Sequence, residues 1–234
     1  TSEYYKTPYQ YKRLPTTISI SSRGCPYKCN FCAIHTIWDW DYRPHSPEYV
    51  VSELKYLQEN FGIRDIKYFD DNFLVDTERV KKISDLITKE KIDISWSCLG
   101  TIATINNHNE LIESMKKSGC WHISFGIETG NAKVMRDIRK PTTVEQVKKV
   151  ITECESNGIS TRGFFMLGHP TDTKETIRET IDFAKSLPFF SVQFNFAIPY
   201  PGTELYSIAK SGIGQFDDNT DYMSGHSEYP VYVP

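Results

Sequence analysis

The chain has 234 residues, of which 39% are hydrophobic and 24% charged, and its formal net charge is −3. This length favours one large domain with a full hydrophobic core over two small domains. The basic residues form no run, which argues against nucleic acid or an anionic membrane surface as a partner. No apolar stretch is long enough to span a bilayer, and we expect a soluble cytoplasmic protein.

Short runs rich in β-forming residues alternate along the chain with longer stretches of helical periodicity. Ser46 followed by Pro47 is typical of a helix start, as is Asp76, and Gly158 is typical of a helix end. We expect strands at 17–21, 66–69, 94–98, 122–127, 161–167 and 192–198. We expect helices at 47–62, from 76 onward, and at 110–117, 143–156, 174–186 and 204–210.

Six strand–helix units in succession predict a parallel sheet. We predict an α/β fold, an incomplete (β/α)₆ barrel of the TIM type, with its chemistry at the carboxyl ends of the strands. Periodicity alone leaves a doubly wound open sheet as the alternative. We assign residues 1–15 to an N-terminal linker, 16–212 to the barrel and 213–234 to the start of a C-terminal extension. The character of both ends indicates a fragment of a longer protein.

Three of the six cysteines, Cys25, Cys29 and Cys32, lie within eight residues, directly after the first expected strand. Thiolates at this spacing suit three corners of an iron–sulfur cluster and would leave one iron open. With His35 as a fourth ligand, the same residues would suit a structural zinc site. A secreted disulfide framework is normally denser in cysteine, so the spacing favours metal chemistry.

The cysteine motif, with an aromatic residue before its last cysteine, resembles that of the radical S-adenosylmethionine (radical SAM) superfamily. Further blocks at strand ends resemble the branch whose members often carry a cobalamin-binding domain ahead of the barrel. These blocks are YFDDN at 68–72, FGIETG at 125–130, FMLGHP at 165–170 and PYPGTELY at 199–206. The resemblance covers nearly the whole chain and implies a [4Fe–4S] cluster that cleaves S-adenosylmethionine to a 5′-deoxyadenosyl radical.

The resemblance also implies ligands for the methionine part of S-adenosylmethionine. Asp71 and Asn72 follow the second strand, where the family places the contact to the methionine ammonium. Glu128 ends the fourth strand and is expected to contact the ribose or the methionine. Arg139 matches a family basic residue suited to the methionine carboxylate. Lys140, next to it, is interpreted as a surface charge.

Further residues are expected around the adenine. Gly168 closes the fifth strand and would let the backbone approach the ring, because it has no side chain. Phe31 and Ile198 would supply apolar contact with the ring, although both also suit a hydrophobic core.

The chain departs from the family at one position. Many relatives carry an arginine shortly after the tryptophan of the third strand, here Trp96, but this chain has Thr101 at that place. The role that the arginine has in those relatives therefore cannot be transferred to Thr101. We expect Cys98 to face the barrel interior, as a substrate-facing thiol or as a small core residue. Cys120 and Cys154 are interpreted as structural.

The resemblance implies an enzyme, and its branch suggests cobalamin-dependent methyl transfer or a related radical modification, with cobalamin bound outside this chain. A cobalamin-free enzyme of the methylthiotransferase kind is the alternative, and a zinc-stabilised binding module is the alternative outside the family. The expected partners are an electron donor such as flavodoxin or ferredoxin and a small-molecule or peptide substrate. The sequence does not identify that substrate.

Overall fold

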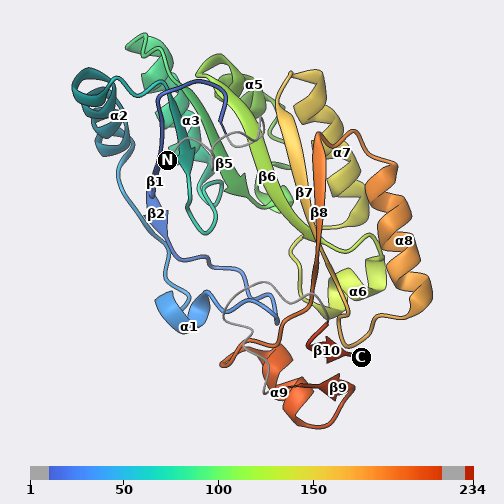
Figure 1. The fold of residues 1–234 in the computed structure, drawn as a ribbon. Coiled ribbons are helices and arrows are strands. Elements are labelled where there is room, and N and C mark those ends of the chain that lie inside the picture. The colour runs from blue at the N-terminus through green and yellow to red at the C-terminus, as the bar shows by residue number, and fades with distance from the viewer. Residues whose placement is uncertain (1–10, 218–229) are drawn as a thin grey trace.

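The computed structural model describes residues 11–217 and 230–234. Its centre is a six-stranded parallel sheet in the order β1-β4-β5-β6-β7-β8 (Figure 1). The strands are β1 (Thr16–Ser19), β4 (Asp65–Tyr68), β5 (Ser95–Gly100), β6 (Cys120–Glu128), β7 (Ser160–Leu167) and β8 (Ser191–Phe196). The helices are α1 (His35–Trp38), α2 (Pro47–Phe61), α3 (Thr77–Lys89), α4 (Ile102–Ile105), α5 (Asn109–Lys117), α6 (Ala132–Asp137), α7 (Val144–Ser156), α8 (Lys174–Lys185) and α9 (Glu204–Lys210).

The strand order follows the order of the chain and never reverses. A doubly wound sheet reverses its order at a switch point, so that alternative is wrong. Within the described residues β1 and β8 do not pair, and the sheet stays open between them. The predicted partial (β/α)₆ barrel is therefore confirmed. None of the helices in the described ranges combines the length and the apolar character needed to span a bilayer.

The expected strands and helices are confirmed to within one or two residues at each end. Local signals explain this accuracy: the Ser46 hydroxyl accepts a hydrogen bond from the Tyr49 amide, and the Asp76 carboxylate accepts one from the Arg79 amide. The prediction missed the short helices α1, α4 and α6. It also missed two short antiparallel pairs, β2 (Ser22–Arg23) with β3 (Arg43–Pro44) and β9 (Gln215–Phe216) with β10 (Tyr232–Val233).

The main core lies between the sheet and the helices on its outer side. Trp96 on β5 is fully buried there, and its indole nitrogen donates to the Ser118 carbonyl at 3.1 Å. Side chains alternate along a strand, so Cys98 shares this outer side, while Leu99 points inward and lines a cavity. Cys98 is buried together with Cys120, whose thiol lies 3.9 Å from the His122 carbonyl oxygen. The prediction that Cys98 faces the barrel interior is wrong.

Cys120 and Cys154 are buried in the same core, as their structural interpretation requires. The segment expected to begin an extension contributes β9 and β10, and Tyr232 packs with the C-terminal elements that precede it. The rest of this segment, residues 218–229, lies outside the described residues. The division at residue 212 stays a prediction.

A buried carboxylate joins the end of β4 to the end of β1. Asp70 accepts hydrogen bonds from the Ser21 amide and the Ser21 hydroxyl, both at 2.7 Å, and from the Ser22 hydroxyl. The Arg79 guanidinium donates to the Ser21 hydroxyl at 2.8 Å and to the Ser21 carbonyl at 3.0 Å. Burial raises the pKa of Asp70 although these hydrogen bonds oppose it. This network fixes the point where the chain enters the cysteine loop.

The inner face of the sheet also carries a buried histidine. A ring nitrogen of His122 on β6 lies 2.8 Å from the Ser160 hydroxyl, and the other lies 3.3 Å from the Ser124 hydroxyl. Burial lowers the pKa of His122 to about 4, and the charges of Arg162 on β7 and Lys67 on β4 act in the same direction.

Replacing the Asp70 carboxylate should destabilise the fold. Asp70→Ala leaves three buried donors without their acceptor, and we expect the free energy of unfolding to fall by at least ~2 kcal/mol. Urea unfolding of the cluster-free full-length chain measures this. Asp93→Ala is the control, because the Asp93 side chain is 74% exposed in its pair with Arg13 and should cost less than ~1 kcal/mol. Equal losses in the two variants would contradict the role of Asp70.

His122 should make stability depend on pH. In the unfolded chain a histidine takes up its proton near pH 6.5, whereas folded His122 stays neutral to about pH 4. The unfolded state therefore binds more protons between these values, and stability falls as the pH drops. Relative to His122→Gln, the wild-type chain should lose about 2 kcal/mol more between pH 7 and pH 5. If the free energy of unfolding, measured with urea, changes equally with pH in the wild type and in His122→Gln, the prediction is refuted.

Candidate active site

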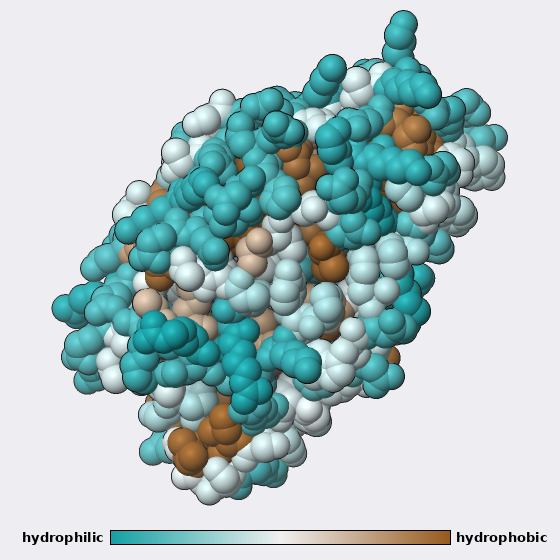
Figure 2. Space-filling view, turned by 180° about the vertical axis from the view of Figure 1, so that it is seen from behind, coloured by the Kyte–Doolittle hydropathy of each residue, from teal (hydrophilic) through white to brown (hydrophobic). Residues whose placement is uncertain are grey.

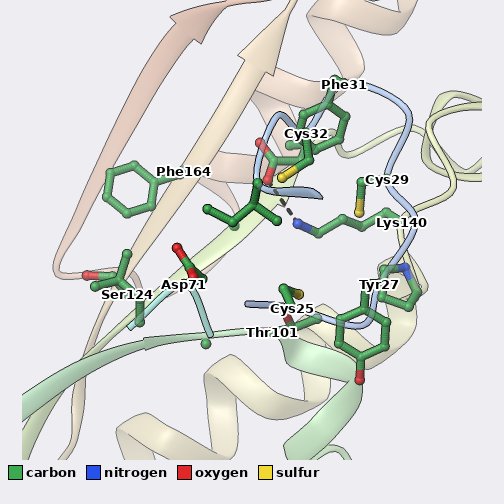
Figure 3. Close-up of a pocket in the computed structure, with 16 residues that line it drawn as sticks. Cys25, Tyr27, Cys29, Phe31, Cys32, Asp71, Thr101, Ser124, Lys140 and Phe164 are labelled. Atoms are coloured by element: carbon green, nitrogen blue, oxygen red, sulfur yellow. Dashed lines mark hydrogen bonds and ion pairs between the residues drawn. The ribbon is translucent and has the colours of Figure 1, made fainter. Parts of the chain in front are cut away.

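The three cysteines of the loop after β1 line one cavity at the carboxyl ends of the strands (Figure 3). The cavity has a volume of about 260 Å³. Ser124 and Phe164 lie across it from Cys29 and Lys140 (Figure 3). Its wall consists of residues from the loop, the strand ends and the segment after α6: Cys25, Tyr27, Cys29, Phe31, Cys32, Ile34, Asp71, Leu99, Gly100, Thr101, Ser124, Gly126, Glu128, Lys140, Pro141 and Phe164.

The cysteine loop is held from three directions. Gly24 has φ +84°, and its amide donates to the Asp71 carboxylate at 2.7 Å. A side chain at Gly24 would also collide with the Asp41 carbonyl, so glycine is required there. The Asn30 amide donates to the Ile138 carbonyl after α6 at 3.2 Å, and the Asn30 carbonyl accepts from Leu205 in α9. These contacts set the positions of the thiols before any cofactor is present.

The three polar residues after β4 have different surroundings. Asp70 is buried in the network described above, whereas Asp71 lines the cavity. Asn72 is buried, and its side-chain nitrogen donates to the Thr101 hydroxyl at 2.9 Å and lies 4.0 Å from the Cys25 sulfur. Its side-chain oxygen has no hydrogen-bond partner among the described residues. Asp71 and Asn72 thus adjoin the cavity, and their predicted contact with a methionine ammonium stays a prediction.

A buried ion pair lies beside the thiols. The Lys140 ammonium donates to the Glu128 carboxylate at 2.9 Å, and the two side chains are only 9% and 11% exposed. The interpretation of Lys140 as a surface charge is therefore wrong. Burial acts to lower the pKa of Lys140, but Glu128 and Cys29 outweigh it and the pKa is raised. Burial raises the pKa of Cys29 to about 11, while the positive charge of Lys140 opposes that rise.

Arg139 lies away from this cavity. Its guanidinium is at the surface, where it forms an ion pair with Glu204 at 2.8 Å. Arg139 has φ +56°, and this turn after α6 sends Lys140, and not Arg139, toward the cysteines. The predicted contact of Arg139 with a methionine carboxylate receives no support from this placement.

Phe31 and Glu128 also line a second cavity of about 230 Å³, which adjoins the first. Ile198 lies in its wall, together with Met166 and Tyr200. Phe31 and Ile198 are thus brought together, as the prediction of an apolar contact to one ring requires. Gly168 lines neither cavity. A side chain at Gly168 would meet only ordinary contacts, so lack of space does not require glycine there. The φ of +89° does require it, because residues with a side chain rarely adopt that conformation.

The zinc interpretation required His35 beside the three thiols. The His35 ring is instead stacked on Trp40 at 4.4 Å between ring centres, and a ring nitrogen lies 3.3 Å from the Gly202 carbonyl. Across residues 11–217 and 230–234, no three His, Cys, Asp or Glu side chains gather closely enough to hold one metal ion. A cubane cluster is larger than an ion and spreads its ligands over a wider space. Three thiols on one cavity wall suit such a cluster.

Comparison with known proteins finds a family and several relatives. The family model "Radical SAM superfamily" matches residues 19–184. An uncharacterized methyltransferase of Pyrococcus horikoshii is 35% identical over 86% of this chain and 43% of its own length. Cytidylyl-2-hydroxyethylphosphonate methyltransferase of Streptomyces wedmorensis is 29% identical over 79% of this chain and 36% of its own length. The chain thus spans less than half of the length of these relatives.

A solved structure shows the same fold. The radical S-adenosylmethionine methyltransferase TsrM of Kitasatospora setae, with cobalamin and a [4Fe–4S] cluster bound, superposes with a TM-score of 0.75. The match covers 85% of this chain and 37% of TsrM at 19% identity, a level at which the likeness concerns the fold alone. The family model covers most of the chain, and its members use a [4Fe–4S] cluster and S-adenosylmethionine. The chain belongs to the radical SAM superfamily.

Proposed function

We propose that this chain is the radical-generating core of a larger enzyme, with Cys25, Cys29 and Cys32 as the ligands of the [4Fe–4S] cluster. The observation that carries the proposal is the cavity that the three thiols share with Asp71 and the Glu128–Lys140 pair. Cluster and S-adenosylmethionine, when bound, supply one-electron cleavage of the sulfonium. The chain's own residues orient S-adenosylmethionine and limit the access of water.

We assign the methionine carboxylate to Lys140 in place of Arg139. The Lys140 ammonium has three N–H donors, and Glu128 holds it at the cavity wall. A carboxylate that joins a buried cation is bound by a charge-assisted hydrogen bond. Asp71, which lines the same cavity, offers a carboxylate to the methionine ammonium, and the Gly24 amide keeps that carboxylate in place. Phe31 and Ile198 would flank the adenine in the adjoining cavity.

For the whole protein we propose cobalamin-dependent methyl transfer, with cobalamin bound by a part outside this chain. The methyltransferase names of two relatives and the cobalamin in TsrM support this proposal. Radical SAM enzymes need a reductant, and a flavodoxin or a ferredoxin would suit. A full-length protein purified with about one cobalamin per chain would agree with the proposal. About eight irons without cobalamin would indicate a second cluster and the methylthiotransferase alternative.

The decisive experiment is product analysis. Full-length protein, reconstituted anaerobically and reduced, should hold about four irons per chain and release 5′-deoxyadenosine from S-adenosylmethionine. Cys29→Ala should lose both the iron and the product. Cys98→Ala is the matched control, because Cys98 is a buried thiol on the outer side of the sheet, and it should keep both. A loaded wild-type cluster without cleavage would refute the proposal.

Lys140→Met should separate substrate binding from cluster binding. Loss of a hydrogen bond to a charged group costs about 1.5–3 kcal/mol, which corresponds to a rise in KM for S-adenosylmethionine of about 10- to 150-fold. Iron content should fall far less than in Cys29→Ala, because Lys140 is not a ligand and only its charge acts on Cys29. Lys133→Met is the control, since Lys133 pairs with Asp137 at the surface. An unchanged KM would exclude the assignment of Lys140.

A further inference from the structure

Two basic residues lie on the inner face of the sheet, below the cysteine cavity. Ser124 and Leu99 line that cavity, and Arg162 on β7 is the register partner of Ser124. Lys67 on β4 is the register partner of Ser97, two residues before Leu99. Residues in register share a face of the sheet, as do residues two apart on a strand. Lys67 and Arg162 therefore face the same interior as the cavity.

The two charges are close enough to oppose each other. Burial lowers the pKa of Lys67, and the charge of Arg162 lowers it further. The Lys67 ammonium lies 4.7 Å from the centre of the Phe69 ring, and within the described residues it forms no ion pair with a carboxylate. The acid two residues before it, Asp65, accepts hydrogen bonds from Thr16, Ser95 and Trp121 instead.

Arg162 is oriented by its neighbours. Its guanidinium Nε donates to the Ser191 hydroxyl at 3.0 Å, and the group lies 5.9 Å from the centre of the Phe164 ring. Phe164 itself lines the cysteine cavity. The Phe164 side chain thus lies between the Arg162 guanidinium and the cavity assigned to S-adenosylmethionine.

Apolar side chains on the same inner face are exposed. Ile18 is the register partner of Lys67 and is 66% exposed, and Phe69 is 49% exposed. Phe190, which precedes β8 and packs edge-on against His122, is 54% exposed. Exposed large apolar groups that gather on one concave surface are typical of a binding site. They lie toward the two edge strands, where the barrel is open.

We propose that the interior of the open barrel binds a substrate with an apolar body and a terminal oxyanion, a carboxylate or a phosphate ester. Lys67 and Arg162 bind the oxyanion, because two neighbouring cations are stabilised by an anion between them. Ile18, Phe69 and Phe164 contact the apolar body, and the far end of the substrate reaches the cysteine cavity. This inference rests on the proposed function, which places S-adenosylmethionine in that cavity.

Calorimetric titration of the full-length protein in a buffer free of oxyanions tests the site. The probes are inorganic phosphate and benzoate, and saturable binding of at least one is expected. Lys67→Met and Arg162→Met should each weaken that binding about tenfold or more, and Lys67→Arg should restore most of it. Lys185→Met, at an exposed lysine of α8, should bind like the wild type. Tighter phosphate binding assigns a phosphate ester, and tighter benzoate binding assigns a carboxylate.

The same variants distinguish this inference from the proposed function. Iron content and 5′-deoxyadenosine formation without substrate should persist in Lys67→Met and Arg162→Met. Saturable anion binding by a wild-type protein that does not cleave S-adenosylmethionine would refute the proposed function alone. The inference is overturned if the wild type binds neither probe, or if both Met variants bind as the wild type does.

Discussion

The site depends on how the chain is held where it leaves β1. Asp70, Ser21, Ser22 and Arg79 form a buried polar network at this point. Charged and polar groups are costly to bury unless each donor finds an acceptor. The geometry of the loop entrance is therefore specified by hydrogen bonds and not by apolar packing, which tolerates small shifts. The adjacent residue, Asp71, holds the Gly24 amide, so one strand end both anchors the loop and lines its cavity.

The cavity has a second electrostatic constraint, the Glu128–Lys140 pair. A lone buried ammonium would lose its proton or leave the site, and the carboxylate of Glu128 prevents both. The pair also places a positive charge near Cys29, and this charge opposes the rise in the Cys29 pKa that burial causes, although the pKa stays at about 11. Thiolate is the form that binds iron. The ammonium of Lys140 thus offsets part of the cost of a buried thiolate at Cys29, while the carboxylate of Glu128 acts against it.

Much of the fold was predictable because its signals are local. Caps at Ser46 and Asp76, and the alternation of strand and helix patterns, set the elements to within one or two residues. The three cysteines were predictable as one site because their spacing places them on a single loop. Short helices such as α6 were missed, since a helix of six residues has too little periodicity to be recognised and is stabilised by its tertiary contacts.

The two wrong placements, Lys140 at the surface and Cys98 in the barrel interior, have a common physical origin. Arg139 and Lys140 are adjacent and both basic, and only the turn after α6 decides which one is buried. Cys98 and Leu99 are likewise adjacent, and a shift of one residue exchanges the two faces of a strand. Sequence patterns place a strand or turn to within about one residue. The role of a side chain depends on the direction in which it points, which changes from one residue to the next. A cation such as Lys140 is recognised only when Glu128, twelve residues earlier in the chain, is known to face it.

Because the sheet is open, side chains on its inner face stay accessible. In a closed barrel, side chains fill the interior as a packed core. Here β1 and β8 do not meet within the described residues, and apolar groups such as Ile18 stay exposed on the concave side. The open edge therefore leaves apolar side chains on the same face of the sheet as the cysteine cavity exposed. In the proposed function the radical is made in that cavity and must meet its substrate at short range, and we propose the open interior as the side from which the substrate approaches.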